Sequence, residues 1–171
     1  MEFAQLEKAR YSLRKFSGRP VEPEKLALVL EAARCAPTAH NNQPQRVFVF
    51  QSEQALKKAD ACAACHFGAP LLLAVGYEPE RAWVRSEFDG KNHGEIDAAI
   101  AVTQMMLQAA ELGLGTTYVG MFDPQALREA FPEMGSCVPI ALLPIGYPAE
   151  GAHPARLHDS RIPLEEMVTY L

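Results

Sequence analysis

The sequence lacks the features that mark a membrane or exported protein. Its longest apolar runs fall far short of the ~20 residues that a membrane-spanning helix needs. No apolar run follows a basic start, as it does in a signal peptide. With only 4 cysteines in 171 residues, a disulfide framework is not indicated. We therefore expect a cytoplasmic protein with reduced thiols and no membrane partner.

Metal-binding motifs are also scarce, although Cys62 and Cys65 have the C-x-x-C spacing and precede His66. A structural zinc site needs a second pair of ligands, which no spacing in the chain supplies. Haem attachment needs export to an oxidising compartment. A redox dithiol is expected at the start of a helix, whereas this pair falls late in an expected helix over residues 54–65. The spacing favours an incidental or structural role, and we expect no metal site.

Glycine-rich phosphate loops and common hydrolase motifs are missing as well. The chain contains neither G-x-G-x-x-G nor G-x-x-x-x-G-K-[ST], and it has no nucleophile elbow and no H-E-x-x-H. A phosphate group, if one is bound, must therefore be held by side chains.

Acidic residues are absent from positions 10 to 21, where Arg10, Ser12 and Arg14 stand at every second position. In an extended chain these three side chains share one side, and in a helix the two arginines still share a face. Arginine forks and a serine hydroxyl are suited to phosphate oxygens. The segment therefore predicts a site for one anionic ligand.

The charge of the rest of the chain limits what that ligand can be. Residues 1–46 carry a net charge of +3 and the remainder −8, so the chain has no broad basic face for nucleic acid. RNA binding by residues 10–19, with Tyr11 and Phe16 stacking on bases, is kept as an alternative. The acidic body favours no nucleic-acid partner.

Hydrophobic periodicity predicts a mixed fold in one domain over residues 1–171. Helices are expected over 2–10, 24–35, 54–65, 95–112 and 124–131, and strands over 46–51, 70–77, 116–120 and 138–147. Residues 78–94 are charged and are expected to form an irregular excursion. Helices before and between buried strands indicate an α/β or α+β sandwich.

The expected helix over 95–112 is apolar nearly all round. Its polar residues form one narrow stripe, which consists of Asp97, Gln104, Gln108 and Glu111. Such a helix needs cover from the core or from a partner subunit. The tail 161–171 also has apolar positions that can cross to a partner. We therefore expect a homodimer.

A short polar loop, A-P-T-A-H-N-N-Q-P-Q at 36–45, follows one expected helix and precedes a strand. Hydroxyl and amide groups such as those of Thr38, Asn41 and Gln43 can donate to and accept from the edge of a heterocycle. The loop is thus a second candidate binding segment.

Four motifs occur together in order: R-x-S-x-R-x-F from Arg10, A-P-T-A-H-N-N-Q-P, A-A-E-L-G-L-G-T, and P-I-G-Y-P before a final arginine-containing segment. From about residue 8 to its end the sequence resembles the FMN-dependent nitroreductase family, in a short form. The resemblance implies a central, mostly antiparallel sheet flanked by helices. It also implies a C-terminal arm exchanged in a homodimer, with FMN at the interface.

The resemblance also implies a set of cofactor-binding residues. It assigns Arg10, Ser12 and Arg161 to the FMN phosphate and Arg14 to the pyrimidine edge of the flavin. It places a loop from the opposite subunit against the flavin, with the residues Pro37, Thr38, Asn41 and Gln43. It places the segment Tyr118, Val119 and Gly120 at the reactive side of the ring. No catalytic side chain is implied, because flavin N5 is the reactive centre.

The implied activity is an FMN-dependent oxidoreductase that passes a hydride from NADH or NADPH to a nitro compound, a quinone or a related acceptor by a ping-pong mechanism. A different flavin reaction on the same scaffold, such as dehalogenation, and flavin binding without turnover remain alternatives. The sequence departs from the family pattern at Gln45, where tryptophan is frequent, at Asp159, where a basic residue is common, and in residues 78–94, which replace a pocket-lining excursion. The identity of the acceptor is therefore not transferred.

Overall fold

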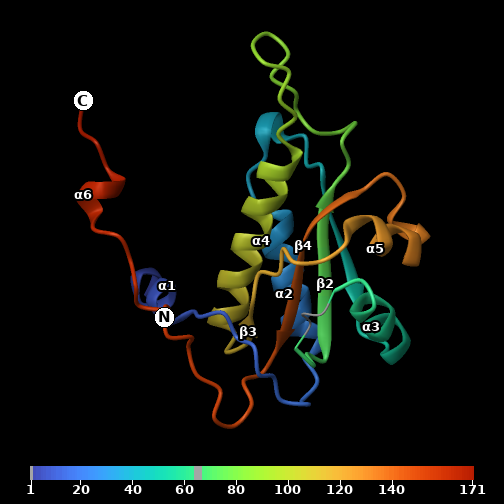
Figure 1. Cartoon of the computed structure of the whole chain (residues 1–171), viewed down its shortest axis with the longest axis vertical. Coiled ribbons are helices and arrows are strands. Elements are labelled where there is room, and N and C mark those ends of the chain that lie inside the picture. The colour runs from blue at the N-terminus through green and yellow to red at the C-terminus, as the bar shows by residue number, and fades with distance from the viewer. Residues whose placement is uncertain (1, 64–66) are drawn as a thin grey trace.

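An antiparallel sheet lies at the centre of the chain, whose computed structural model describes residues 2–63 and 67–171 (Figure 1). Within these residues it has four strands in the order β1-β2-β4-β3. They are β1 (Gln45–Phe50), β2 (Leu71–Tyr77), β3 (Gly115–Thr116) and β4 (Val138–Gly146). The α+β class and the antiparallel pairing expected from the sequence are confirmed.

Helices cover both faces of this sheet. They are α1 (Phe3–Ala9), α2 (Pro23–Arg34), α3 (Glu53–Asp60), α4 (Gly94–Glu111), α5 (Pro124–Ala130) and α6 (Leu164–Met167), with short 3-10 turns η1 (Ala39–Asn41) and η2 (Pro132–Met134). Local signals set their starts: Pro23 occupies the first position of α2, where it loses no helical hydrogen bond. Ser52 caps α3 and Asp123 caps α5, each by accepting backbone N–H groups.

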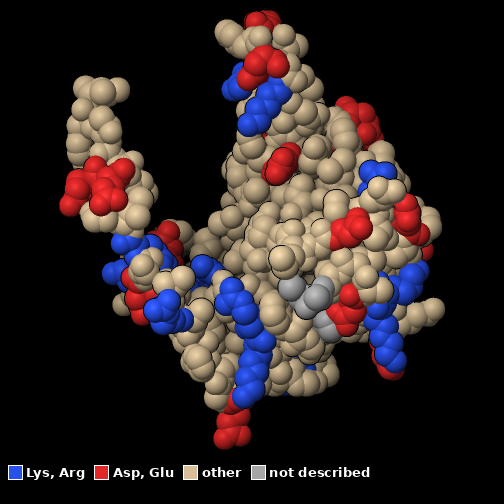
Figure 2. Space-filling view, viewed as in Figure 1, with Lys and Arg blue, Asp and Glu red and all other residues tan. Residues whose placement is uncertain are grey.

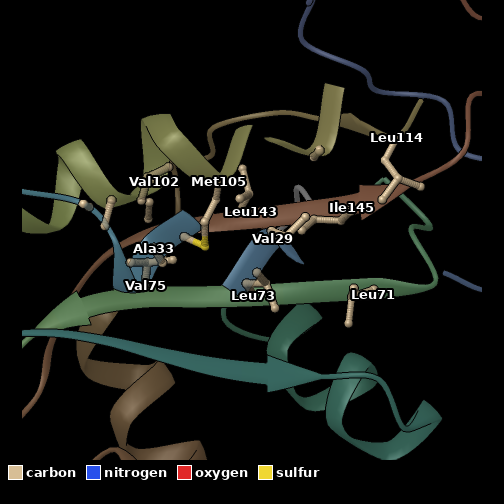
Figure 3. Close-up of a cluster of buried hydrophobic side chains, with 14 residues drawn as sticks. Val29, Ala33, Leu71, Leu73, Val75, Val102, Met105, Leu114, Leu143 and Ile145 are labelled. Atoms are coloured by element: carbon tan, nitrogen blue, oxygen red, sulfur yellow. The ribbon is translucent and has the colours of Figure 1, made fainter. Parts of the chain in front are cut away.

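The larger core lies between the sheet and the helices α2 and α4 (Figure 3). Val29 of α2 and Met105 of α4 are fully buried against Leu73 of β2 and Leu143 of β4. The two central strands are apolar without alternation because both of their faces are covered.

A second core lies on the opposite face, under α3, α5 and η2. Phe50 stacks on Phe131 with ring centroids 4.4 Å apart. Leu72 and Leu142, which alternate with the residues that face the first core, point to this side. The sheet is therefore the middle layer of a three-layer sandwich.

Two expected elements are shorter than the sequence suggested. The strand expected over 116–120 is regular only at Gly115–Thr116, and beyond it Val119 alone pairs with β4, at Leu142. The helix expected over 54–65 ends at Asp60, because the chain turns and the carbonyl of Cys62 accepts the N–H of Asp123 at 2.9 Å. Cys62 thus lies after the helix, and the prediction for Cys65 and His66 falls outside the described residues.

Two segments extend from the sandwich (Figure 1). Residues 78–94 form the expected excursion, which contains a short hairpin closed by the bridge between Val84 and Asn92 and projects beyond the start of α4. The tail leaves the body beside α1, and α6 is its one regular turn within the described residues. None of the helices described here is long and apolar enough to cross a membrane.

Candidate functional site

The segment after α1 is extended, so Arg10, Ser12 and Arg14 do alternate along a strand-like stretch. Ser12 forms a parallel bridge with Thr116, and the N–H of Leu13 donates to the carbonyl of Thr116 at 2.9 Å. Leu13 between them is 1% exposed. The buried leucine anchors the segment to the edge of the sheet, and the alternation leaves its neighbours on the other side.

Arg10 and Thr116 each carry a buried polar atom without a partner. The Nη1 atom of Arg10 and the Oγ1 atom of Thr116 make no hydrogen bond to any described residue. A buried donor that lacks an acceptor is destabilising by about 1–3 kcal/mol, and by more when it is charged. Both groups belong to segments joined at the bridge between Ser12 and Thr116. A bound anion or another acceptor can supply the hydrogen bond that the Nη1 atom of Arg10 lacks.

A cavity of about 250 Å³ adjoins the same segment. It is lined by Ser12, Leu13, Arg14, Lys15, Gly151, Ala152, His153 and Ala155. Arg14 is exposed and its Nη1 donates to the carbonyl of Ser12 at 3.3 Å. Lys15 donates to the carbonyl of Glu150 at 2.9 Å and ties the start of the tail to this segment.

Arg161 lies in the exposed tail, a short way beyond its contact with the N-terminal segment. His158 contacts the carbonyl of Lys8 at 3.2 Å and the ring of Tyr11. The guanidinium of Arg161 donates to tail carbonyls, that of Ser160 at 2.8 Å and that of His158. Figure 2 shows Lys and Arg side chains gathered where the tail leaves the body. The structure therefore brings Arg161 to the same end of the molecule as Arg10.

Residues 118–120 continue from this edge along β4. Val119 is buried and exchanges two backbone hydrogen bonds with Leu142, whereas Gly120 is exposed. The Tyr118 hydroxyl donates to the carbonyl of Ile140 at 3.4 Å. Partial burial raises the pKa of Tyr118, and the negative charge of Glu95 adds to that effect.

The polar loop at 36–45 lies at the other end of α4. The N–H of Ala39 donates to Oδ1 of Asp97 at 3.0 Å, and Asp97 is 2% exposed. Asp97 is therefore buried, and its carboxylate holds the loop. Pro37, Asn41 and Gln43 are exposed.

The loop has a folded backbone that its own side chains support. His40, Asn41 and Gln43 have φ values of 53°, 56° and 51°, in the left-handed region that residues other than glycine seldom adopt. Thr38 accepts the N–H of Gln43 at 3.1 Å, and the Gln43 amide donates to the carbonyl of Asn41 at 3.2 Å. These bonds hold the amides of the loop in one arrangement.

The excursion packs against this loop through aromatic rings. Trp83 stacks on His40 with centroids 5.4 Å apart and meets His93 edge-on at 4.7 Å. The base of the excursion and the polar loop therefore form one unit at the start of α4.

The two candidate binding segments are separated by the length of α4 within one chain. Residues 10–14 pair beside Thr116, just after the helix ends, whereas the polar loop is bound to Asp97 near its start. α4 has 18 residues, which span about 27 Å at 1.5 Å per residue. One chain thus brings Arg10, Ser12 and Arg14 together but does not bring them to Asn41 or Gln43.

Comparison with known proteins identifies the family of the chain. The model of the Nitroreductase family matches residues 8–67 and 61–147. The chain belongs to the nitroreductase family. A nitroreductase family protein from Clostridium difficile 630 superimposes with a TM-score of 0.92 at 42% identity, covering 99% of this chain and 98% of that one.

Two further proteins are similar to this chain, one in sequence and one in fold. The protein called FMN reductase [NAD(P)H] from Bacillus subtilis is 30% identical over 94% of this chain and 71% of its own length. A protein from Exiguobacterium sibiricum, solved in complex with FMN, shares the fold with a TM-score of 0.86 at 21% identity, covering 100% of this chain and 98% of that one.

Sequence reasoning missed three residues that organise the site. Thr116 pairs with Ser12, Asp97 holds the polar loop, and Trp83 stacks on it. The signal for Asp97 was present, because a carboxylate that falls among the apolar residues of a helix needs a hydrogen-bond partner when it is buried. No local pattern signals Thr116 or Trp83, because their partners are far away in the sequence.

Proposed function

We propose that this protein is an FMN-dependent oxidoreductase that takes a hydride from NADH or NADPH and gives it to a nitro compound, a quinone or a related acceptor in a ping-pong cycle. The name of the Bacillus subtilis relative and the FMN in the Exiguobacterium sibiricum protein support the cofactor and the nicotinamide donor. When bound, FMN supplies the hydride-transfer chemistry, so the protein needs only to bind, orient and tune it.

The observation that carries the proposal is the unpaired, buried Nη1 of Arg10 in a segment without acidic residues. A phosphate group offers acceptors for this donor, and the bond would be charge-assisted. We assign Arg10, Ser12 and Arg161 to the phosphate. Arg161 can turn toward it, since its present partners are carbonyls of its own exposed tail.

Arg14 has a different role in the proposal. It is exposed, and its one hydrogen bond in the described part of the chain is a 3.3 Å contact with its neighbour Ser12. We place this cation at the pyrimidine edge of the flavin, where it stabilises negative charge. The backbone of Tyr118, Val119 and Gly120 faces the ring on the side where donor and acceptor react in turn.

The complete site requires a homodimer. Two copies related by a two-fold axis across α4 would bring the start of one α4 near the end of the other. The loop with Pro37, Thr38, Asn41 and Gln43 would then approach the phosphate-binding segment of the partner. A groove of about 470 Å³ lies beside α1, α2 and α4 and is proposed to receive the C-terminal arm of the second copy. Its lining is apolar at Phe3, Leu6, Ala32 and Leu107 and polar at Gln104, Gln108 and Glu111.

The experiment that tests the proposal starts from the visible spectrum of the purified protein. We expect a flavin spectrum, or uptake of added FMN with a stoichiometry of about one per chain. NADH or NADPH should then be oxidised in the presence of a quinone or a nitroaromatic compound, with parallel double-reciprocal plots. A protein that is colourless and takes up no FMN contradicts the proposal.

Two other outcomes of the same experiment identify the alternatives. FMN binding without oxidation of either nicotinamide by any acceptor indicates a flavin-binding protein for storage or sensing. Reduction of bound FMN followed by loss of halide from a halogenated substrate, but no reduction of quinones, indicates dehalogenation on this scaffold.

A further inference from the structure

A second basic cavity lies between α2 and the edge strand β1, away from the segment that carries Arg10. Its volume is about 350 Å³. Its lining includes Gln43 and the three arginines Arg34, Arg46 and Arg81. Three of these side chains are guanidinium groups, which come from the end of α2, from β1 and from the base of the excursion.

Carboxylates lie around this cavity but do not line it. Glu31 holds Arg34 through a 2.7 Å bond to Nε. Glu78 holds Arg46 at 2.5 Å and also lies 3.5 Å from Arg81. The negative charge of Glu80 also interacts with Arg81 and Arg46. Three carboxylates therefore surround the three guanidinium groups, but the lining of the cavity contains only the arginines and no carboxylate.

Arg81 has the most unused hydrogen-bonding capacity of the three arginines. Its 3.5 Å contact with Glu78 is its one ion pair in the described part of the chain, and its side chain is 57% exposed. A guanidinium carries five N–H donors in a planar fork. Arg34 is exposed as well and uses one edge of its fork on Glu31. Both forks remain able to bind an anion with several oxygens.

The position of the cavity links it to the proposed flavin site. Gln43 lines the cavity and also belongs to the loop that we place against FMN. Arg46 donates to the carbonyl of Gln43 at 3.2 Å, so the cavity wall and the loop are hydrogen-bonded. A dinucleotide whose nicotinamide ring lies at the flavin can therefore extend its adenosine end over this loop into the cavity.

On this basis we propose that the cavity binds the 2′-phosphate of NADPH and makes NADPH the preferred hydride donor. The inference rests on the proposed function, since it names the donor of that same site. A phosphate monoester carries about −1.5 to −2 charges near pH 7 and three acceptor oxygens, which suits forked donors in a cavity lined by three arginines and no carboxylate. NADH lacks this group, so the same arginines do not hold it.

The first test measures binding without relying on flavin. Calorimetric titration of the purified protein with 2′-AMP should give binding that weakens about tenfold or more in Arg81→Ala and in Arg34→Ala, because charge-assisted bonds are lost. Arg81→Lys should fall between them and the wild type, since it keeps the charge but loses the fork. Arg128→Ala is the matched control, because Arg128 is exposed on α5 beside a different cavity.

The second test uses steady-state kinetics of the FMN-loaded protein. The ratio of kcat/KM for NADPH to that for NADH should fall about tenfold in Arg81→Ala and stay unchanged in Arg128→Ala. An unchanged ratio in Arg81→Ala overturns the inference, as does inorganic phosphate that binds as tightly as 2′-AMP. If FMN is not bound at all, the proposed function fails, while the 2′-AMP titration still decides whether the cavity takes a ribose phosphate.

Discussion

Asp97 accepts a hydrogen bond from the backbone N–H of Ala39 at 3.0 Å, across 58 positions of the sequence. The bond joins the start of the longest helix to the polar loop that carries Asn41 and Gln43. Because Asp97 is 2% exposed, the bond is shielded from water. The loop backbone is left-handed at three residues other than glycine, so it depends on contacts of this kind to keep its shape.

Removing this carboxylate should loosen the loop. Asp97→Ala is expected to lower the free energy of unfolding by about 1.5–3 kcal/mol, as for loss of a buried bond to a charged group. It should also speed amide hydrogen exchange in residues 38–43. Asp97→Asn keeps an acceptor oxygen, so it should lower the free energy of unfolding less than Asp97→Ala does. Equal exchange in the wild type and Asp97→Ala would show that the loop does not need this bond.

Gly115 packs against Leu13, in the segment of residues 10–14 that we propose binds the FMN phosphate. A Cβ atom at this position would lie 2.2 Å from Cδ2 and 2.8 Å from Cβ of the buried Leu13. Gly115→Ala should therefore displace residues 10–14, with a loss of about 1–3 kcal/mol from overpacking. Thermal unfolding and FMN titration would measure the two effects.

The control for this substitution is Gly18→Ala, since a Cβ at Gly18 meets nothing within 4 Å. We expect unchanged FMN affinity and an unchanged unfolding temperature in that variant. If Gly115→Ala behaves in the same way, the contact with Leu13 does not position the segment.

Acid should weaken the attachment of the segment that leads into α2. The Tyr147 hydroxyl donates a hydrogen bond to the Glu22 carboxylate at 2.6 Å. This bond is the main reason that the pKa of Glu22 falls from 4.5 to about 2, and the backbone N–H of Glu22 and the side chain of Arg19 lower it further. Because the pKa is lower in the folded state, the resulting stability is present above about pH 4.5 and is lost as the pH falls toward 2.

Glu22→Gln tests this dependence. The difference in unfolding free energy between the wild type and the variant should be largest near neutral pH and should disappear toward pH 2. Chemical unfolding at a series of pH values measures it, with Glu24→Gln on the same helix as control. A difference that does not change with pH would mean that the ionised carboxylate of Glu22 is not what stabilises this junction.

The exposed apolar side chains of the tail should matter for assembly. Leu164 and Met167 on α6 are 62% and 67% exposed within one chain. If the arm docks on a second copy, each side chain buries apolar area worth about 1.5–3 kcal/mol. The double variant Leu164→Ser, Met167→Ser should therefore weaken the dimer by several orders of magnitude in Kd, as measured by analytical ultracentrifugation.

The charged neighbours on the same turn provide the control for the tail. Glu165→Gln with Glu166→Gln should leave the dimer intact. A wild-type protein that is a stable monomer in light scattering while FMN is bound at full occupancy would exclude both the dimer and the arm exchange.

Local sequence patterns predicted the central elements closely. The helix expected over 95–112 is found at Gly94–Glu111, and the strand expected over 138–147 at Val138–Gly146. Both have long apolar stretches whose periodicity identifies the type of secondary structure. The edge strand at 116–120 was overestimated, because its length depends on which residues of β4 it pairs with rather than on its own composition.

The proposed binding residues were predictable as types but not as an arrangement. The alternation of Arg10, Ser12 and Arg14 is visible in the sequence and is kept in the extended segment. That this segment and the polar loop lie at opposite ends of α4 is a property of the tertiary fold. The same holds for the basic cavity, since Arg34 and Arg81 become neighbours only when α2 and the excursion pack around β1.

The two arginines of the N-terminal segment should be separable by flavin binding. The guanidinium of Arg10 is half-buried with an unpaired Nη1, whereas Arg14 is exposed. If Arg10 holds the phosphate, Arg10→Ala should weaken the binding of FMN by about tenfold or more. The binding of riboflavin, which lacks the phosphate, should weaken much less.

If Arg14 lies at the ring, Arg14→Ala should weaken the binding of both flavins alike. It should also lower the reduction potential, because a positive charge that stabilises the reduced flavin is lost. Paired titrations with FMN and riboflavin, and a redox titration of each variant, measure these effects. Equal loss of both flavins in Arg10→Ala, or an unchanged potential in Arg14→Ala, would reverse the assignment of the two roles.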